Sequence, residues 1–246
     1  MSLTPVCNTC LEAIHPIEGP RCAACGERLM SRHLTSERDG SPLCGMCIRN
    51  EPAFTRASAY GSYDAGLRDL VHLLKYERVK PAAHVLGRML AEVVADLAEA
   101  FAPEAPVVMA VPLHASKLRQ RGFNQSELMA RAMLKLKPAA LDAKLNTTAL
   151  LRSRATESQT GLTPPQRREN VRGAFKVVRR DQISGKDILL VDDVFTTGTT
   201  VSECARVLRR AGAERVFVAT VARVLKPEAE RAEPEFDQPR AMSAHA

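Results

Sequence analysis

An apolar run at residues 188–191, followed at once by two aspartates and a threonine-rich loop, constrains the fold more than any other part of the chain. A continuous apolar run of this length is typical of a strand covered on both faces, as in a parallel sheet flanked by helices. A helix after the loop is predicted from apolar residues at helical spacing, namely Val201, Cys204, Ala205 and Leu208. Gly212 is placed to end that helix, and a second strand is expected at 216–220. The order strand, loop, helix, strand predicts a βαβ unit with parallel strands.

The polar groups that follow the first of these strands suit a phosphorylated sugar. Asp192 and Asp193 come at its carboxyl end, where open α/β sheets bind ligands. The loop offers hydroxyls, backbone N–H groups and a sterically unhindered glycine directly before a helix N-terminus, which favours an anion. Its members are Thr196, Thr197, Gly198, Thr199 and Thr200. We therefore expect the aspartates to hold a ribose and the loop to hold its phosphate.

Two other interpretations of this segment stay open. In the first, the aspartates cap a turn and the threonines form an ordinary surface loop. The second is a nucleotide hydrolase, because an apolar run that ends in two aspartates resembles a magnesium-binding Walker B strand. The G-x-x-x-x-G-K-[ST] phosphate loop of those enzymes does not occur in the sequence, since Gly185-Lys186 is followed by Asp187.

The preceding part of the chain alternates between strands and helices. Strands are expected at 57–63 and 107–111. Asp64 is expected to cap a helix with an apolar stripe made by Leu67, Leu70, Val71 and Leu74. A longer helix is expected at 83–100. This alternation predicts an α/β fold with a doubly wound, mainly parallel sheet.

Six of the seven cysteines fall in the first 47 residues as three C-x-x-C pairs. In a reducing compartment this spacing favours a metal, and four thiolates form a closed, structural, tetrahedral site for Zn²⁺. The favoured ligands are Cys22, Cys25, Cys44 and Cys47, and the alternative set is Cys7, Cys10, Cys22 and Cys25. Unliganded or redox-active cysteines are a third interpretation. Cys204 lies on the apolar face of its helix and is expected to be a packed core thiol.

These patterns divide the chain into a cysteine-rich zinc module at 1–50, an α/β domain at 51–226 and a tail at 227–246. The tail is rich in Glu, Ala and Pro and is expected to be disordered. No stretch reaches the roughly 18 consecutive apolar residues of a transmembrane helix, and the N-terminus lacks a basic-then-apolar signal pattern. We therefore expect a cytoplasmic protein without membrane insertion.

A second group of candidate ligand residues follows the strand at 107–111. Lys117, Arg119 and Arg121 are expected in a loop at the carboxyl end of that strand, facing the same crevice as the aspartates, where a pyrophosphate needs cations. Ordinary solvated charges are the alternative. The basic segment 149–178 is interrupted by Pro164 and Pro165, and it is expected to form either a lid over the ligand or a solvated hairpin.

The acidic pair and the loop at 196–200 resemble the signature of type I phosphoribosyltransferases. This resemblance implies that Asp192 and Asp193 hold the 2′- and 3′-hydroxyls of phosphoribosyl pyrophosphate and that the loop binds its 5′-phosphate. Mg²⁺ is expected with this ligand, because it prefers oxygen ligands and substrate phosphates. The basic residues would then stabilise the pyrophosphate.

From Cys7 to about Val224 the chain is similar to the ComF/GntX-like family, on account of several further features. These are the cysteine module, the motifs Leu74-Lys75-Tyr76 and Val111-Pro112-Leu113, the stretch 119–125, and the segment through Arg168, Asn170 and Phe175. Members are described as phosphoribosyltransferase-like proteins, and those of competent bacteria assist the uptake of transforming DNA on the cytoplasmic side. The resemblance implies binding of phosphoribosyl pyrophosphate or a related nucleotide, with transfer to an acceptor that the sequence does not identify. Larger members carry four C-x-x-C pairs and this chain has three, so one complete zinc site is expected.

The second functional hypothesis is a binding protein without turnover. The net charge is +7, and residues 117–180 hold fifteen Lys or Arg against four Asp or Glu, a local excess of about +11. Such a surface suits a polyanion, which predicts binding of single-stranded DNA or an adaptor role among DNA-uptake proteins. Only Phe123 and Phe175 are aromatic in that stretch, whereas unpaired bases normally stack on several aromatic side chains.

Overall fold

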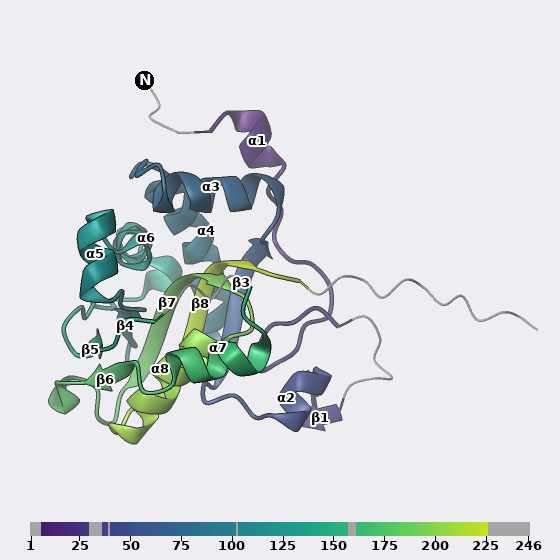
Figure 1. The fold of residues 1–246 in the computed structure, drawn as a ribbon. Coiled ribbons are helices and arrows are strands. Elements are labelled where there is room, and N and C mark those ends of the chain that lie inside the picture. The colour runs from purple at the N-terminus through teal and green to yellow at the C-terminus, as the bar shows by residue number, and fades with distance from the viewer. Residues whose placement is uncertain (1–5, 30–35, 39, 102, 157–160, 226–246) are drawn as a thin grey trace, which may run out of the picture.

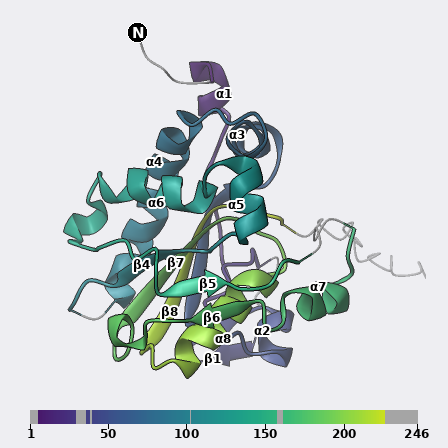
Figure 2. The ribbon, with the colours of Figure 1, turned by 60° about the vertical axis from the view of Figure 1, so that its left-hand side comes forward.

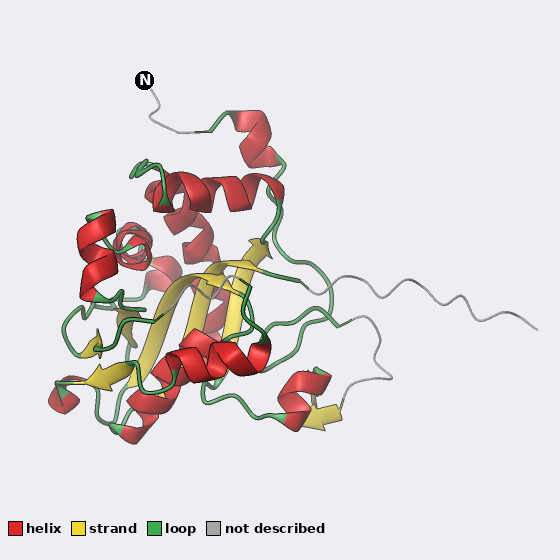
Figure 3. Cartoon of the chain, in the orientation of Figure 1, coloured by secondary structure: helices red, strands yellow, loops and turns green. Residues whose placement is uncertain are grey.

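The computed structural model describes residues 6–29, 36–38, 40–101, 103–156 and 161–225, and its centre is a four-stranded parallel sheet (Figure 1). The strand order is β3-β8-β7-β4, with β3 at Arg56–Ser62, β8 at Arg215–Arg223, β7 at Asp187–Phe195 and β4 at Val107–Ala110. All three neighbouring pairs are parallel. Helices lie on both sides of the sheet (Figure 3), which confirms the predicted doubly wound α/β fold. The predicted tail at 227–246 lies outside the described residues.

Three helices, α3 (Ala65–Lys75), α4 (Ala82–Leu97) and α6 (Gln125–Leu134), cover one face of the sheet (Figure 2). Their apolar stripes pack against Leu189 and Val191 of β7. The crossing of α4 and α6 depends on Gly87, because a Cβ at that position would lie 2.5 Å from the Cβ of Ala132. The single helix predicted at 83–100 corresponds to two elements in the structure, α4 and a short 3₁₀ turn at Ala98–Ala100.

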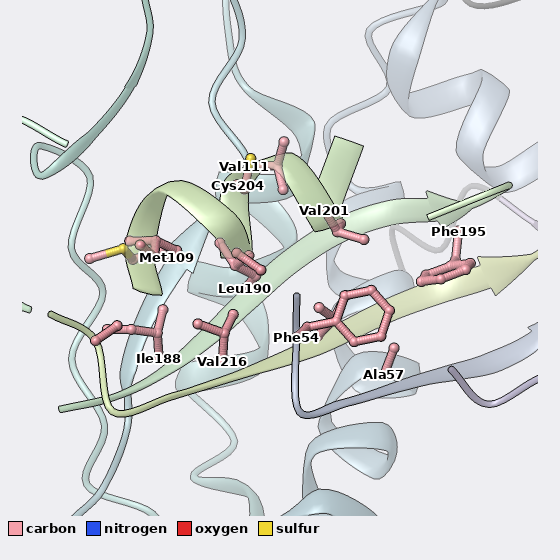
Figure 4. Close-up of a cluster of buried hydrophobic side chains, with 14 of the residues drawn as sticks. Phe54, Ala57, Met109, Val111, Ile188, Leu190, Phe195, Val201, Cys204 and Val216 are labelled. Carbon is pink, nitrogen blue, oxygen red and sulfur yellow. The ribbon is translucent and has the colours of Figure 1, made fainter. Parts of the chain in front are cut away.

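The other face of the sheet is covered by α8 (Thr199–Arg210) and by the cysteine module. Figure 4 shows Ile188 and Leu190 of β7 together with Val201 and Cys204 of α8 in this core. Successive side chains of β7 thus pack alternately in the apolar clusters on the two faces of the sheet, as expected for a strand buried on both faces. Cys204 is fully buried, which confirms its prediction as a core thiol.

Strand β7 runs further than predicted. Its ladder with β8 continues through the pairs Asp192 with Thr220, Val194 with Ala222 and Phe195 with Arg223. The two aspartates therefore lie inside the strand and not after it, because β8 supplies backbone partners beyond the apolar run. The predicted βαβ unit, formed by β7, α8 and β8, is confirmed.

The cysteine-rich region contains α1 (Asn8–Glu12), β1 (Ser36–Arg38), β2 (Ser41–Leu43) and α2 (Gly45–Arg49). Its second part joins β3 directly, since Ala57 N donates to Ala24 O over 2.7 Å. A Cβ at Gly26 would lie 2.8 Å from Ala57 O, so the knuckle and the strand are in close contact. The four buried cysteines of this region belong to the same apolar cluster as Phe54 and Leu190, which makes the core of the module continuous with that of the sheet.

The basic stretch after β4 is more regular than the sequence suggested. Lys117, Arg119 and Arg121 lie on a short helix, α5 (Ala115–Arg121), and not in a loop. Further along, β5 (Leu150–Arg152) pairs antiparallel with β6 (Phe175–Val177). In the sequence, α7 (Pro164–Val171) comes between these two strands. The two prolines are the first residues of α7, where their missing N–H groups cost nothing, and the segment is not one continuous helix, as the prolines indicated. None of the described helices has the length and apolarity needed to cross a bilayer.

Candidate functional site

Asp193 is held inside the protein at the end of β7. Lys75 Nζ of α3 lies 2.7 Å from Asp193 Oδ1, and Gln125 Nε2 of α6 donates to Asp193 Oδ2 over 2.7 Å. Arg121 in turn donates to Gln125 Oε1. Because only 5% of Asp193 is exposed and both of its oxygens are engaged, its carboxylate anchors two helices to the strand.

Asp192 is less buried and lies beside the N-terminus of α6. Its Oδ1 accepts hydrogen bonds of 3.0 Å from Ser126 Oγ and from the Asp193 N–H. Loss of hydration, followed by the charge of Asp193, raises the pKa of Asp192 to about 7, although Lys75 opposes the shift. A carboxyl group with a pKa near neutrality changes charge in the range where a cell operates, and such groups are concentrated at functional sites.

Lys75 is the residue that sequence reasoning missed. Burial by itself lowers the pKa of Lys75, but the charge of Asp193 and the hydrogen bond to it raise the pKa above the ordinary value. Lys75 was noticed only as part of a family-like motif, since nothing in the spacing of α3 relates it to an acid 118 positions later. Sequence reasoning also assigns no separate role to Gln125 or Ser126, which lie in the first turn of α6 after its cap at Asn124.

The threonine-rich loop follows β7 directly and leads into α8. Gly198 is the N-cap of α8 and has a left-handed backbone, with φ 71°, which a glycine adopts without strain. A Cβ on Gly198 would lie only 2.4 Å from Cζ of Phe195, so the loop rests against that ring. Thr196 and Thr197 are exposed, and the hydroxyls of Thr197 and Thr199 are 2.7 Å apart. The first amides of a helix have no acceptor within the helix, so a helix N-terminus favours an anion in general, and that of α8 follows the strand that carries the aspartates.

The three basic residues of α5 do not behave alike. Arg121 is buried and belongs to the network around Asp193 through Gln125. Burial, then the charges of Arg121, Arg152 and Lys75, lowers the pKa of Lys117, which places Lys117 within the field of the other cations. Arg119 is exposed and forms no ion pair or hydrogen bond with any described residue. Two of the three predicted pyrophosphate residues therefore share surroundings with the acidic pair.

Arg152 of β5 adds a cation from the basic segment. Its guanidinium lies 5.3 Å from the centre of the Phe175 ring, and its Nε has no hydrogen-bond partner although it is buried. Burial lowers the pKa of Arg152, and the negative charge of Asp192 acts in the opposite direction. The segment is tied to α8, because Glu203 Oε1 accepts from the Gly173 N–H over 2.8 Å. The lid function predicted for this segment stays a prediction.

Four cysteines form a compact cluster on the α8 side of the sheet. The sulfur atoms of Cys22, Cys25, Cys44 and Cys47 all lie within 4.8 Å of one another, and all four residues are buried. Cys25 Sγ and Cys44 Sγ are 3.7 Å apart, and sulfurs bound to one tetrahedral Zn²⁺ at about 2.3 Å would be about 3.8 Å apart. Side-chain hydrogen bonds with Cys22, then with Cys25 and Cys44, raise the pKa of Cys47, so the thiols are in direct contact with one another. The chemistry and spacing of these donors therefore fit a metal ion.

The favoured set of four cysteines is thus brought together, and the alternative set is not. Cys7 and Cys10 are exposed and contact each other, with the Cys10 N–H 3.4 Å from Cys7 Sγ. They lie on α1, which packs beside α3, since a Cβ at Gly66 would come within 3.3 Å of Cys10 O. Within the described residues, Cys7 and Cys10 do not join the buried cluster.

The parallel sheet, the acidic end of β7 and the threonine-rich loop after it define a phosphoribosyltransferase-like α/β protein. In agreement, the phosphoribosyl transferase domain model matches residues 122–238. Among solved structures, a hypoxanthine phosphoribosyltransferase from Staphylococcus aureus is 14% identical, with 58% of this chain and 64% of that chain covered and a TM-score of 0.35. So low a score adds nothing to the assignment.

Curated relatives match along almost the whole chain. The DNA utilization protein YhgH of Escherichia coli is 31% identical over 221 residues, which cover 89% of this chain and 91% of the relative. Competence protein F of Haemophilus influenzae is 28% identical, with 88% and 96% covered. Competence protein ComFC of Bacillus subtilis is 22% identical, with 84% and 79% covered. The chain belongs to the ComF/GntX-like family.

Proposed function

We propose that the protein binds phosphoribosyl pyrophosphate, or a related ribose phosphate, together with Mg²⁺ at the carboxyl end of β7. The observation that carries this proposal is that one strand presents a carboxyl group of raised pKa, Asp192, and then the anion-binding terminus of α8. Few ligands other than a sugar phosphate offer hydroxyls for the carboxyl group of Asp192 and a phosphate for the N-terminus of α8. The phosphoribosyltransferase-like domain supports the same ligand class.

Each part of the ligand has a partner in this arrangement. Asp192 would accept the ribose hydroxyls, directly or through Mg²⁺, which prefers oxygen ligands and neutralises phosphate charge. Asp193 would contribute its negative charge from the interior, because Lys75 and Gln125 already occupy its oxygens. Thr196, Thr197, Gly198, Thr199 and Thr200 would bind the 5′-phosphate, whereas Lys117, Arg121 and Arg152 would face the pyrophosphate.

Transfer of the phosphoribosyl group would break the bond between C1′ and the pyrophosphate oxygen and form a bond from C1′ to a nucleophile. The bonding electrons leave with pyrophosphate, so the sugar gains positive charge and the leaving group gains negative charge in the transition state. Asp192 and Asp193 lie on the side that would stabilise the sugar, and the basic residues of α5 and β5 would stabilise the leaving group. The segment from β5 to β6 would exclude water when it closes.

Calorimetric titration of the full-length protein with phosphoribosyl pyrophosphate and Mg²⁺ tests the binding step. Asp192→Asn should weaken binding at least tenfold, since it removes a charge-assisted contact worth about 1.5–3 kcal/mol. Asp187→Asn is the matched control, because Asp187 lies at the opposite end of β7 and pairs with Arg215 over 2.6 Å. Equal affinity in the wild type and the Asp192→Asn variant would refute the assigned role.

Catalytic turnover is tested separately from binding. We expect Mg²⁺-dependent release of pyrophosphate when the protein, phosphoribosyl pyrophosphate and the correct nitrogenous base are combined, and the base is found by screening purines, pyrimidines and simple amines. Binding without release for every base would indicate an adaptor that has kept the ligand site of an enzyme. The names of the relatives, which refer to competence and DNA utilization, lead us to propose a cytoplasmic role in DNA uptake or use.

A second candidate function, binding of single-stranded DNA, is favoured by a basic groove away from the acidic pair. The groove has a volume of about 290 Å³ and is lined by β6, the turn after it and the last turns of α8. Lys176, Arg180 and Arg210 line it and form no ion pair with any described residue, whereas Arg206 is paired with Glu203. Val177 and Val207 supply apolar surface between the cations.

Salt dependence tests this second function. Binding of a single-stranded oligonucleotide should weaken linearly with ionic strength on logarithmic axes, with a slope of about −0.7 for each phosphate contacted. Arg180→Gln combined with Arg210→Gln should make the slope shallower by about 1.4. Arg119→Gln combined with Arg131→Gln is the control for total charge. An equal change in both double variants would mean that the groove has no special part in DNA binding.

A further inference from the structure

The last residue of β8, Arg223, reaches the cysteine cluster. Its guanidinium donates to Cys25 O over 2.5 Å and to Cys25 Sγ over 3.6 Å, and it pairs with Glu27 Oε2 at 2.7 Å. Only 3% of Arg223 is exposed, so its two terminal nitrogens are held by these partners and not by water, whereas its buried Nε has no hydrogen-bond partner among the described residues. A donor to a cysteine sulfur favours the thiolate that binds a metal, and such outer contacts orient metal ligands.

The same guanidinium lies against Phe195 of the neighbouring strand. The centre of the charge is 4.5 Å from the centre of the Phe195 ring, within the range of a cation–π interaction. Phe195 and Arg223 are direct partners in the ladder between β7 and β8, and Val224 N donates to Phe195 O over 3.0 Å. The ring of Phe54 lies edge-on to that of Phe195 with centres 6.0 Å apart (Figure 4). Phe195 is therefore confined on more than one side.

Phe195 is also the residue that precedes the threonine-rich loop. Its ring fills the space where a side chain at Gly198 would stand, 2.4 Å from Cζ to the hypothetical Cβ. The backbone of the loop thus rests directly on the ring. A continuous series of contacts joins Cys25, Arg223, Phe195 and Gly198, although the cysteine and the glycine are far apart in the sequence.

We propose that Arg223 and Phe195 couple the cysteine cluster to the loop at 196–200, so that a metal in the cluster strengthens phosphate binding at the loop. This inference rests on the proposed phosphate-binding role of the loop. A metal fixes Cys25, which fixes Arg223 and the ring beneath Gly198, and a loop held in its binding shape loses less entropy when a phosphate binds. Binding linkage makes the effect reciprocal, so the phosphate ligand strengthens metal binding by the same factor. Arg223 and Phe195 are positioning residues in this scheme.

The test compares the full chain with zinc bound and after removal of zinc by a chelator that leaves Mg²⁺ in solution. Calorimetry gives the affinity for phosphoribosyl pyrophosphate with Mg²⁺, and hydrogen–deuterium exchange gives the protection of the amides at 196–200. In the wild type, zinc removal should weaken the affinity at least about fivefold, the lower end of ordinary coupling between sites. Exchange at 196–200 should become faster by a clearly larger factor than exchange in α4, which reports the change in global stability.

Phe195→Leu is the decisive variant, because it keeps an apolar side chain and removes the ring. It should bind the ligand more weakly even with zinc present, and zinc removal should then change affinity and exchange little. Phe101→Leu is the matched control, since Phe101 stacks edge-on with Phe217 at 4.9 Å in the opposite core. The Phe101→Leu variant should keep the full dependence on zinc. Arg223→Lys, which keeps the charge near Glu27 and loses the planar group, should resemble Phe195→Leu.

Three results would overturn the coupling. These are equal affinity and equal exchange with and without zinc in the wild type, an undiminished zinc dependence in Phe195→Leu, and faster exchange in α4 to the same extent as in the loop. Absence of ligand binding in every state would refute the proposed function instead. Hydrogen–deuterium exchange at 196–200 would then test the coupling by itself, because this measurement requires no ligand. Zinc-dependent protection of these amides that is lost in Phe195→Leu would still support the coupling.

Discussion

Lys75 Nζ lies 2.7 Å from Asp193 Oδ1, and this ion pair joins the last turn of α3 to the end of β7. Only 16% of the Lys75 side chain and 7% of the Asp193 side chain are exposed, so the pair is largely removed from water. The pair therefore fixes the position of the acidic strand end relative to the helices that cover it. Its strength is a direct measure of how rigidly the proposed ligand site is built.

Replacement of Lys75 by Met should destabilise the protein strongly. Loss of one partner of a buried pair leaves an uncompensated charge and typically costs about 3–5 kcal/mol of unfolding free energy. Urea unfolding measures this, and the double variant with Asp193→Asn should recover part of the loss. Arg131→Met removes the exposed ion pair with Glu127 on α6 and should cost no more than about 1 kcal/mol. A similar small cost for Lys75→Met would show that the buried pair contributes little.

Stability should depend on pH through Asp192. Because the pKa of Asp192 is raised to about 7 in the folded protein, the folded state holds a proton that the unfolded state releases near pH 4. The contribution of this group is complete below the unfolded pKa and is lost as pH rises towards 7, with a slope of at most about 1.4 kcal/mol per pH unit. Asp192→Asn should remove this slope in urea unfolding between pH 5 and 7. An identical profile in the variant would mean that another group titrates.

Ligand affinity should show the opposite pH trend. The ionised form of Asp192 binds ribose hydroxyls and Mg²⁺ more strongly than the protonated form, so affinity for phosphoribosyl pyrophosphate should rise through pH 7 and then level off. The affinity of Asp192→Asn should be low and should keep only the pH dependence of the ligand itself. Calorimetry from pH 6 to pH 8.5 compares the two proteins under the same conditions.

Gly198→Ala should distort the loop through two separate effects. The left-handed backbone costs an alanine about 1–2 kcal/mol, and the new Cβ would meet the Phe195 ring at 2.4 Å. Gly185→Ala separates these effects, since Gly185 has a similar φ of +68° and nothing within 4 Å of its hypothetical Cβ. Ligand affinity should fall at least tenfold in Gly198→Ala and should not change in Gly185→Ala. Equal affinity in both variants would show that the loop tolerates the displacement of the ring.

Removal of metal should destabilise the chain through the buried cysteine cluster. We expect one zinc per chain, and Cys44→Ser should lose the metal and lower the unfolding temperature, because the cluster shares its core with the sheet. Cys7→Ser should keep both the metal and the stability, since Cys7 is exposed and lies outside the cluster. Elemental analysis and thermal unfolding measure these quantities. Loss of zinc from Cys7→Ser would favour the alternative set of ligands.

Local patterns in the sequence predicted most of the architecture. The apolar run of β7, the periodicity of α8 and Gly212 after its end led to the βαβ unit, and the spacing of the cysteines led to the four that meet. The predicted strand was shorter than β7, because polar residues such as Asp192 end the apolar pattern. The ladder with β8 nevertheless continues beyond them. The basic residues of α5 were predicted in a loop, because no long apolar stripe marks so short a helix.

The sequence by itself determined the central strands, the longer helices and the residue types at the end of β7, since these depend on backbone periodicity and on groups a few residues apart. Tertiary structure alone decided which of those residues meet. Lys75 reaches Asp193 across 118 positions and Arg223 reaches Cys25 across 198. Both contacts exist because the order β3-β8-β7-β4 brings distant strand ends and helices together, and burial there makes each charge require a partner. No local pattern carries that information.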